Sequence, residues 1–291
     1  MNSYVVTGGG RGIGRAIVER LVRGGGTVVV IERDGEALSW LSGPSLVGVV
    51  GDAADESLVE EAADRAEAAA PLRGWVNNAA VFRDASVHSA PTSTVLDLIA
   101  VNLSLAVVGC AVAVRRFLAA GTPGAIVNVS SHQARRAVPG CLPYVTAKAA
   151  IEGLTRALAV EYGPHGIRVN AVAPGSVATQ RYTEYLAGLG ASGAAAVEAE
   201  MAQLHPLGRV ARADEVAGGG GPAAGRRRRL HHRRHPAGRR RPLRTCAGSR
   251  AAPLVASLSA ARAGQKGPAH AGCGRSGVGG GGVRSGDIRN G

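Results

Sequence analysis

Six short apolar runs, separated by longer stretches with helical periodicity, constrain the fold of this chain more than any other feature. The runs are rich in Val and are too short to be buried helices. We predict strands at Tyr4–Thr7, Thr27–Ile31, Leu46–Val50, Gly74–Asn77, Ala125–Val129 and Arg168–Val172. Apolar strands that alternate with helices are typical of a parallel sheet covered on both faces. The sequence therefore predicts a doubly wound α/β fold.

Charge is distributed unevenly along the chain. Residues 1–217 carry 18 Lys and Arg against 20 Asp and Glu, whereas residues 218–291 carry 16 against 1. The net charge of +13 therefore describes only the last quarter of the sequence. We expect a globular domain over residues 1–217. Residues 218–291 form a Gly/Arg/Pro-rich tail with too few large apolar residues to offset the entropy of ordering.

The cysteine pattern and the amino terminus indicate a cytoplasmic protein. The four cysteines are widely spaced, so they predict neither a disulfide framework nor a metal site. The amino terminus leads directly into an apolar strand. We find no basic leader and no uninterrupted apolar stretch of about 18 residues. We therefore expect neither an export signal nor a membrane span.

The first predicted strand ends in the turn TGGGRGIG at Thr7–Gly14, and we predict that a helix follows over Ile13–Arg23. Gly8, Gly12 and Gly14 let the backbone approach a pyrophosphate, and the free N–H groups of the helix point toward it. Glycine-rich turns are common, so the turn by itself is a weak signal.

Tyr144 and Lys148 lie four residues apart, and Ser131 lies thirteen residues before the tyrosine. A phenol has a pKa of about 10 and is a poor base near neutrality unless a cation stabilises its phenolate. Positions i and i+4 share one face of a helix, so Lys148 can lie beneath Tyr144. Separately, these residues have ordinary interpretations as an interface aromatic, a solvated lysine and a turn former. In register with the glycine turn, they favour a proton-transfer site.

The spacing of the glycine turn resembles the short-chain dehydrogenase/reductase family, in particular its 3-oxoacyl-ACP reductase and secondary-alcohol dehydrogenase type. The resemblance runs from residue 3 to about residue 217 and includes Gly51-Asp52, Asn77–Ala80 and Arg168–Gly175. It implies a Rossmann-like fold and NAD(P)-dependent interconversion of a secondary alcohol and a ketone. It also implies four catalytic residues, in which Asn102 anchors a water relay to Lys148. The four are Asn102, Ser131, Tyr144 and Lys148.

The resemblance also implies a set of cofactor-binding residues. They are Gly8, Arg11, Gly12, Ile13, Gly14, Glu32, Arg33, Asp52, Ala53, Asn78, Ala79, Tyr144, Lys148, Pro174, Gly175, Val177 and Thr179. Glu32 can accept hydrogen bonds from the ribose hydroxyls and would repel a 2′-phosphate, whereas Arg33 and Arg11 could pair with that phosphate. We favour NAD(H), with NADP(H) as the alternative. Asn77 and Asn78 have an equally good interpretation as structural residues.

The segment from Gln180 to about Pro206 lies where the family places its substrate lid. It contains Tyr182 and Tyr185, followed by a run of small residues from Gly188 to Ala196 that defines no particular substrate. We therefore expect a small-molecule alcohol or ketone as substrate and leave its identity open. We expect a family-like homo-oligomer only if the usual carboxyl terminus is present.

The tail departs from the family pattern. After Ala217 the family continues toward a Phe-Ile-Thr-Gly-like segment and a final strand ending near Val-Asp-Gly-Gly. A GC-rich coding of Phe-Ile-Thr-Gly-Ala-Ile-Leu-Pro-Val-Asp-Gly-Gly, read one base early, reproduces Leu230–Pro242 at all thirteen positions. We hypothesise a frame change between about codons 217 and 222, which replaces the last strand with a disordered basic tail. The chain as written would then fold poorly or aggregate.

Two other classes of function are compatible with parts of the sequence. The basic tail could be an arm for nucleic acid or an anionic surface, attached to a dinucleotide-binding module. The tail contains no aromatic residue for base stacking, so we do not expect nucleic acid as a partner. A cofactor-binding sensor without catalysis is disfavoured because the four implied catalytic residues are all present.

Overall fold

The central sheet has the strand order β3-β2-β1-β4-β5-β6, and each pair of neighbours is parallel. The structure is a computed structural model that describes residues 1–218. Its strands are β1 (Ser3–Thr7), β2 (Thr27–Glu32), β3 (Leu46–Val50), β4 (Leu72–Asn77), β5 (Ala125–Val129) and β6 (Arg168–Val172). All six predicted strands are confirmed, with differences of one or two residues at the ends of β1, β2 and β4. The order reverses between β1 and β4, where a sheet of this kind opens a crevice at its carboxyl edge.

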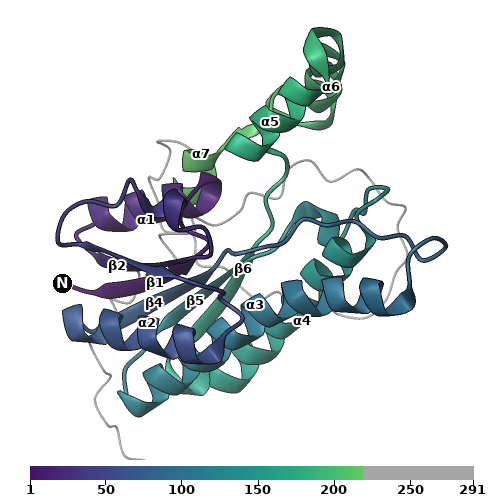
Figure 1. Cartoon of the computed structure of the whole chain (residues 1–291). Coiled ribbons are helices and arrows are strands. Elements are labelled where there is room, and N and C mark those ends of the chain that lie inside the picture. Colours follow the sequence, from purple (N-terminus) through teal and green to yellow (C-terminus); the bar gives the residue numbers. More distant parts are fainter. Residues whose placement is uncertain (219–291) are drawn as a thin grey trace, which may run out of the picture.

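Helices cover both faces of the sheet, as predicted (Figure 1). The α-helices are α1 (Gly12–Arg23), α2 (Glu56–Ala69), α3 (Thr92–Ala119), α4 (Leu142–Tyr162), α5 (Gln180–Gly188), α6 (Gly190–Leu204) and α7 (Ala213–Gly218). Short 3₁₀ turns are η1 (Gly35–Leu38), η2 (His132–Ala134) and η3 (Gly163–His165), and β7 (Val177–Ala178) pairs with β8 (Ala211–Arg212). Helices α1 and α7 lie on one face of the sheet, and α2, α3 and α4 lie on the other.

The hydrophobic core has two layers because side chains alternate across each strand. Val5 of β1 faces α2, α3 and α4, whereas Tyr4 and Val6 face α1 and α7. Trp75 and Phe117 are fully buried in the first layer, as the sequence predicts. Because β1, β2, β4 and β5 are almost entirely buried, their carboxyl ends are fixed points from which the site can be built.

A buried polar network joins β4 and β5 to the helices below them. The Asn77 side chain accepts a hydrogen bond from Trp75 Nε1 (2.9 Å) and donates to Asn128 Oδ1 (2.8 Å) and Cys110 Sγ (3.2 Å). Asn128 in turn donates to Thr155 Oγ1 at 2.9 Å. Burial raises the pKa of the Cys110 thiol to about 12, so this cysteine is an inert part of the network. Asn77 therefore has the structural role that the sequence left open.

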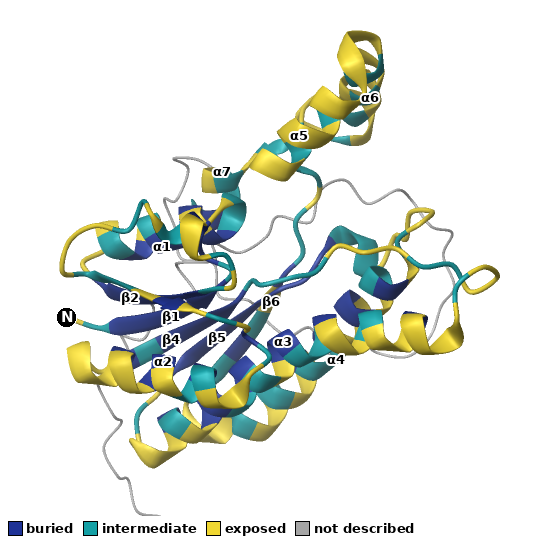
Figure 2. Cartoon of the chain, viewed as in Figure 1, coloured by how far each residue is buried: buried dark blue, intermediate teal, exposed yellow. Residues whose placement is uncertain are grey.

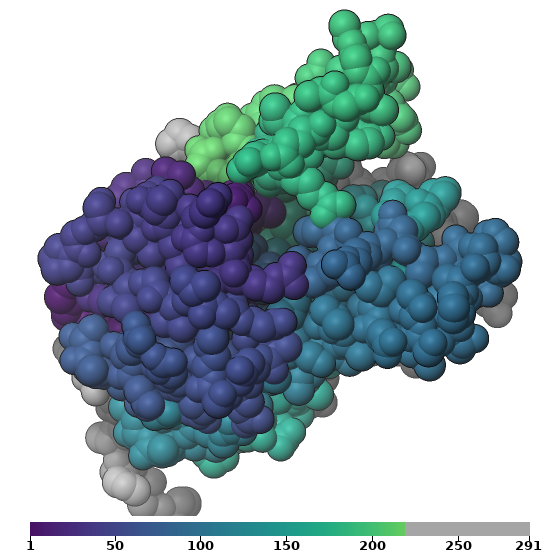
Figure 3. Space-filling model, in the orientation of Figure 1, coloured from purple at the N-terminus to yellow at the C-terminus, as the bar shows by residue number. Residues whose placement is uncertain are grey.

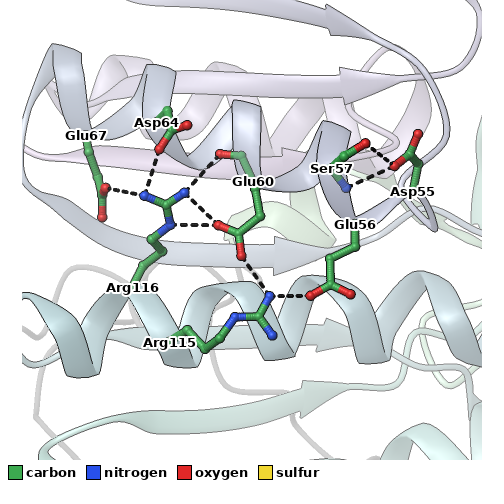
Figure 4. A network of polar contacts seen from close by, with 8 residues as sticks. All are labelled: Asp55, Glu56, Ser57, Glu60, Asp64, Glu67, Arg115 and Arg116. Atoms are coloured by element: carbon green, nitrogen blue, oxygen red, sulfur yellow. Dashed lines mark hydrogen bonds and ion pairs between the residues drawn. The ribbon is translucent and has the colours of Figure 1, made fainter.

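A surface network of charged residues joins α2 to α3 (Figure 4). Arg116 contacts Glu60 (2.6 Å), Asp64 (2.7 Å) and Glu67 (3.1 Å), and Arg115 contacts Glu60 at 2.7 Å. Isolated surface pairs contribute little, but a shared network holds its members in one geometry more effectively. The network holds the carboxyl-terminal half of α3 against α2.

Helix α3 is, by length and composition, apolar enough to cross a membrane, and it is the one such helix among residues 1–218. In the structure it packs against α4, β4 and α2, and its inner face is buried in the core. A helix buried in the core of a protein can be as long and as apolar as a membrane-spanning helix.

Helices α5 and α6 form the lid segment (Gln180–Leu204), which projects from the body (Figure 3). Neither helix contains a buried residue, in contrast with α1 and α4 (Figure 2). The predicted tail begins at Gly218, which is the last residue of α7. Its remainder, with the predicted disorder, the lost final strand and the frame change, concerns residues 219–291, which lie outside the described residues.

Candidate active site

One cavity of about 790 Å³ opens at the carboxyl edge of the sheet, where the strand order reverses. Its walls include the glycine turn, the ends of β2, β4 and β5, the start of α4 and the first turn of α5. Every residue that the sequence analysis assigned to catalysis or cofactor binding lines this cavity, with the exception of Asn102. The structure therefore brings the two predicted groups of residues into one space.

The glycine turn leaves no room for side chains. A Cβ atom at Gly14 would lie 2.0 Å from the carbonyl oxygen of Gly8. Gly8 and Gly12 have φ angles of +63° and +52°, in the left-handed region that favours glycine. No side chain caps the first turn of α1, so its backbone N–H groups remain free to bind a ligand in the cavity. These are the features that a diphosphate requires.

Asn78 holds the glycine turn from the neighbouring strand. Its side-chain amide donates hydrogen bonds to Gly8 O (2.7 Å) and Thr7 O (3.2 Å). The Thr7 hydroxyl accepts from the backbone N–H groups of Asn78 and Ala79, each at 3.1 Å. The end of β4 therefore braces the turn at the end of β1.

Glu32 lies at the end of β2 and faces the glycine turn. Its carboxylate accepts hydrogen bonds from the backbone N–H groups of Gly10 (3.1 Å) and Arg33 (3.0 Å). Arg11 forms an ion pair with Asp34 at 2.5 Å. This pair and backbone hydrogen bonds hold the pKa of Asp34 below its usual value. One of the two arginines expected to attract a 2′-phosphate is thus already paired with a carboxylate.

Trp40, two residues after η1, supports the same turn, and the sequence analysis did not single it out. Its Nε1–H donates to Gly10 O at 3.0 Å, and the Arg15 guanidinium lies 4.5 Å from its ring centroid. The signal in the sequence is a large aromatic that follows β2 within ten residues, but nothing local shows that it reaches the turn.

Tyr144, Lys148 and Ser131 converge at the inner end of the cavity. Tyr144 and Lys148 share one face of α4, and Lys148 Nζ lies 5.4 Å from the Tyr144 ring centroid. Lys148 is 3% exposed and donates to Val129 O at 2.7 Å. Ser131 lies two residues after β5, at the start of η2, and its hydroxyl accepts a hydrogen bond from Gln133 N at 3.2 Å.

Burial dominates the acid–base properties of these groups. It lowers the pKa of Lys148 to about 8. Burial also raises the pKa of the Tyr144 phenol, while the Ser131 hydroxyl and the Arg181 charge partly oppose that rise. The sequence led us to expect that Lys148 would make the phenol more acidic. In the cofactor-free structure burial instead raises the pKa of Tyr144, so the phenol stays protonated at neutral pH.

Asn102 lies within α3 rather than at its end, so it is not a helix cap. Its side chain accepts from Val81 N and donates to Val81 O, each at 2.9 Å, and also donates to Leu98 O at 3.2 Å. The side chain is therefore committed to the loop that follows β4, which carries Ala79 and Phe82 along the cavity wall.

Phe82 contacts both Tyr144 and Arg181, the second residue of the lid segment. The Phe82 ring lies parallel to the Tyr144 ring within 30°, with centroids 4.9 Å apart. The Arg181 guanidinium lies 3.9 Å from the centroid of the Phe82 ring. Sequence reasoning missed Phe82, although an aromatic in the loop after the fourth strand is a signal that could have found it.

The segment after β6 completes the cavity. Pro174 O accepts hydrogen bonds from the backbone N–H of His132 (2.9 Å) and lies 3.2 Å from His132 Nδ1. His205, at the end of α6, receives a hydrogen bond from Ser176 N at 3.3 Å. Gly175 and Thr179 line the cavity between these two contacts. Among residues 1–218 no group of three potential metal ligands is found.

The residues present fit a dinucleotide. The Cβ-free turn, the uncapped start of α1 and the Glu32 carboxylate all line the cavity, together with Ser131, Tyr144 and Lys148. A diphosphate next to such a turn and a ribose next to an acid after β2 is the binding mode of doubly wound folds.

Comparison with known proteins agrees with this geometry. A family model of the short chain dehydrogenases matches residues 2–188. The chain is similar to 2,5-dichloro-2,5-cyclohexadiene-1,4-diol dehydrogenase of Sphingobium indicum, with 38% identity over 74% of this chain and 86% of the relative. It is also similar to L-xylulose reductase of Mus musculus, with 38% identity over 60% of this chain and 71% of the relative.

Solved structures give the same result. The crystal structure of levodione reductase matches with a TM-score of 0.66 and 28% identity, over 74% of this chain and 87% of that chain. Thermoplasma acidophilum aldohexose dehydrogenase matches with a TM-score of 0.65 and 26% identity, over 74% and 83% of the two chains. Because the family model covers more than half of the sequence, this chain belongs to the short chain dehydrogenase family.

Proposed function

We propose that this chain interconverts a secondary alcohol and a ketone with NAD(H), and that Tyr144 transfers the proton. The observation that carries the proposal is the convergence of Tyr144, Lys148 and Ser131 on the cavity that the glycine turn also lines. Family membership makes the chain an NAD(P)-dependent oxidoreductase acting on alcohols or ketones.

Each catalytic side chain has a distinct task. In ketone reduction the protonated Tyr144 phenol donates its proton to the substrate oxygen, and Ser131 donates a hydrogen bond to the same oxygen. In alcohol oxidation Tyr144 must first lose its proton. The Lys148 ammonium beneath the ring then stabilises the phenolate, which the burial of Tyr144 otherwise disfavours.

The cofactor supplies the hydride acceptor or donor when it is bound. Gly8, Gly12 and Gly14 would admit its diphosphate, and Glu32 would accept hydrogen bonds from the adenosine ribose. Pro174–Thr179 would hold its nicotinamide end. The remaining residues of the implied cofactor set line the wall between these points. They are Arg11, Ile13, Arg33, Asp52, Ala53, Asn78 and Ala79.

Two observations support NAD(H) over NADP(H). The Glu32 carboxylate faces the turn where a 2′-phosphate would lie, and like charges repel. Arg11, which could neutralise that phosphate, is paired with Asp34. Arg33 is exposed at the same edge and is the residue that would support NADP(H).

Asn102 contributes in a different way from the other three. Its side chain fixes the Val81 loop, so any role in a water relay to Lys148 would fall to its backbone or to water held nearby. We propose that Asn102 anchors the water relay, and its side-chain contacts also support a role in positioning the Val81 loop.

Aromatic side chains suggest which substrates to test first. Phe82, Tyr182 and Tyr185 line the same cavity as Tyr144, and flat aromatic walls suit a ring-shaped substrate. The Sphingobium relative is named for a cyclohexadiene diol. We propose a small cyclic secondary alcohol or the corresponding ketone as substrate.

The test is a screen of the full 291-residue protein with NAD and NADP against cyclic secondary alcohols, sugars and β-keto thioesters. A parallel protein with the reading frame restored after codon 217 separates the chemistry of the site from the effect of the tail. Turnover by the restored protein and not by the full chain would support our hypothesis that the tail impairs folding. No NAD(P)-linked turnover by either soluble, folded protein would contradict the proposed function.

We propose that a homo-oligomer requires the restored carboxyl terminus and that the protein is cytoplasmic. Sedimentation of the two proteins would test the first of these.

A further inference from the structure

Glu152 is a buried carboxylate on α4, one helical turn after Lys148, and the proposed mechanism does not use it. Its side chain is 9% exposed. A buried carboxylate is unfavourable unless hydrogen bonds and opposite charges compensate for its lost hydration. The contacts of Glu152 therefore show what this side chain holds together.

The carboxylate contacts residues on both sides of Ser131. Oε2 accepts a hydrogen bond from Arg135 Nε at 2.9 Å. Oε1 lies 3.5 Å from Ser130 Oγ, which also donates to Lys148 O at 3.2 Å. Ser130 directly precedes Ser131, and Arg135 follows it by four residues. The segment that presents the catalytic serine is thus held at both ends by one side chain of α4.

The same segment is also tied to the sheet. Ser130 N donates to Val172 O at 2.7 Å, and His132 N donates to Pro174 O at 2.9 Å. These bonds place the segment relative to β6, but Tyr144 and Lys148 are carried by α4. Glu152 connects the segment to that helix, close to the hydrogen bond from Lys148 Nζ to Val129 O.

We propose that Glu152 is a positioning residue that sets the place of Ser131 relative to Tyr144 and Lys148. The inference rests on the proposed function, because it assigns Glu152 a role in aligning that catalytic group. Displacement of a reacting group by about 1 Å can cost about a hundredfold in rate. A connection between the serine segment and the tyrosine helix is therefore expected to act on turnover.

The exposed partners make this proposal testable by substitution. The side chains of Arg135 and Arg156, which both approach Glu152, are 73% and 71% exposed. Removal of the carboxylate leaves both guanidinium groups in water, so no unpaired charge is buried. The change is expected to loosen the serine segment rather than unfold the domain.

The experiment compares Glu152→Ala and Glu152→Gln with Glu161→Ala, all in the full chain. Glu161 is an exposed carboxylate on the same helix, away from the serine segment. We would measure kcat, the substrate KM and the cofactor Kd, together with amide hydrogen exchange of residues 129–136 in the cofactor-free protein. The exchange measurement does not depend on activity.

We expect Glu152→Ala to lower kcat by about tenfold to a hundredfold, to change cofactor Kd by less than about twofold and to speed exchange of residues 129–136. Glu152→Gln retains the shape and one acceptor, so it should recover most of kcat. Glu161→Ala should match the parent protein in every measurement.

Unchanged exchange and unchanged kcat in Glu152→Ala would overturn the proposal, as would an equal loss in Glu152→Gln with no change in exchange. If Glu152→Ala does not fold, Arg135→Ala removes the same contact from the exposed side and must show the same local increase in exchange. A parent protein without NAD(P)-linked turnover would contradict the proposed function, while the exchange comparison would still decide whether Glu152 holds the segment.

Discussion

The glycine turn and the lid segment line the same cavity but are built in opposite ways. The turn lies between fully buried strands and is braced by Asn78 and Trp40, and added atoms at Gly14 would collide with backbone. The lid helices α5 and α6 contain no buried residue. Core packing therefore fixes the cofactor side in advance, whereas the substrate side depends on a few contacts such as the stack of Arg181 on Phe82.

The largest expected difference between the two regions comes from adding one methyl group to each. Gly14→Ala should weaken cofactor binding at least about a hundredfold, because its Cβ would lie 2.0 Å from Gly8 O. Gly188→Ala, at the end of α5, meets nothing within 4 Å and should change unfolding free energy by less than about 1 kcal/mol. Cofactor titration and urea unfolding measure the two effects. Equal cofactor affinity in the two variants would contradict the contrast.

The burial of Lys148, which lines the cofactor side of the cavity, predicts that the unfolding free energy of the protein depends on pH. Its folded pKa of about 8 lies below the ordinary value of 10.5. Between these values the unfolded chain binds more protons, so stability rises with pH. The unfolding free energy of the parent protein, minus that of Lys148→Met, should increase by up to about 3 kcal/mol from pH 8 to pH 10.5. A difference that stays flat across this range would show that Lys148 is solvated.

Substitution of Asp34 tests whether the Arg11–Asp34 ion pair determines the preference between NAD and NADP. Asp34→Asn keeps the side-chain acceptor for Glu36 N but removes the charge that pairs with Arg11. With Arg11 free for a 2′-phosphate, the NADP-to-NAD ratio of kcat/KM should rise about tenfold. Glu36→Gln, a neighbouring loss of charge without that pair, is the control. An unchanged ratio would assign the preference to Glu32.

The smallest effect is expected on the substrate side. Arg181→Ala and Phe82→Leu each remove a contact of the Phe82 ring, and a cation–π contact near the surface is worth about 0.5–1 kcal/mol. Each should raise the substrate KM about threefold and leave cofactor Kd unchanged. In the double variant the two effects should not add, because both act on the Phe82 ring. If the two changes in KM add fully, Arg181 affects substrate binding independently of Phe82.

The sequence predicted the sheet well because its strands are short, rich in β-branched residues and bounded by glycine or charge. The ends that differ, Ser3, Leu72 and Glu32, lie at positions where pairing with a neighbouring strand decides the boundary. The glycine turn and the order of the strands follow from local pattern. The cavity at the point of strand reversal follows from the fold.

Other parts of the site depend on contacts between distant residues and leave no local pattern. Trp40 reaches Gly10 across 30 positions, and the Asn77 amide meets Asn128 across 51. Burial raises the pKa of Tyr144, while Ser131 and Arg181 lower it, so the spacing with Lys148 did not predict the direction of the shift. The small residues of α6 form a regular helix, but they give no indication of a substrate.

The most direct test of the account is the effect of Tyr144→Phe on turnover and on cofactor binding in the same preparation. Loss of the hydroxyl should lower kcat by about a thousandfold, because general acid–base catalysis contributes about 10² to 10⁴ in rate. The ring remains stacked on Phe82, so cofactor Kd should stay within about twofold of the parent value. Turnover within tenfold of the parent protein would contradict the assignment of Tyr144 as the proton-transfer group.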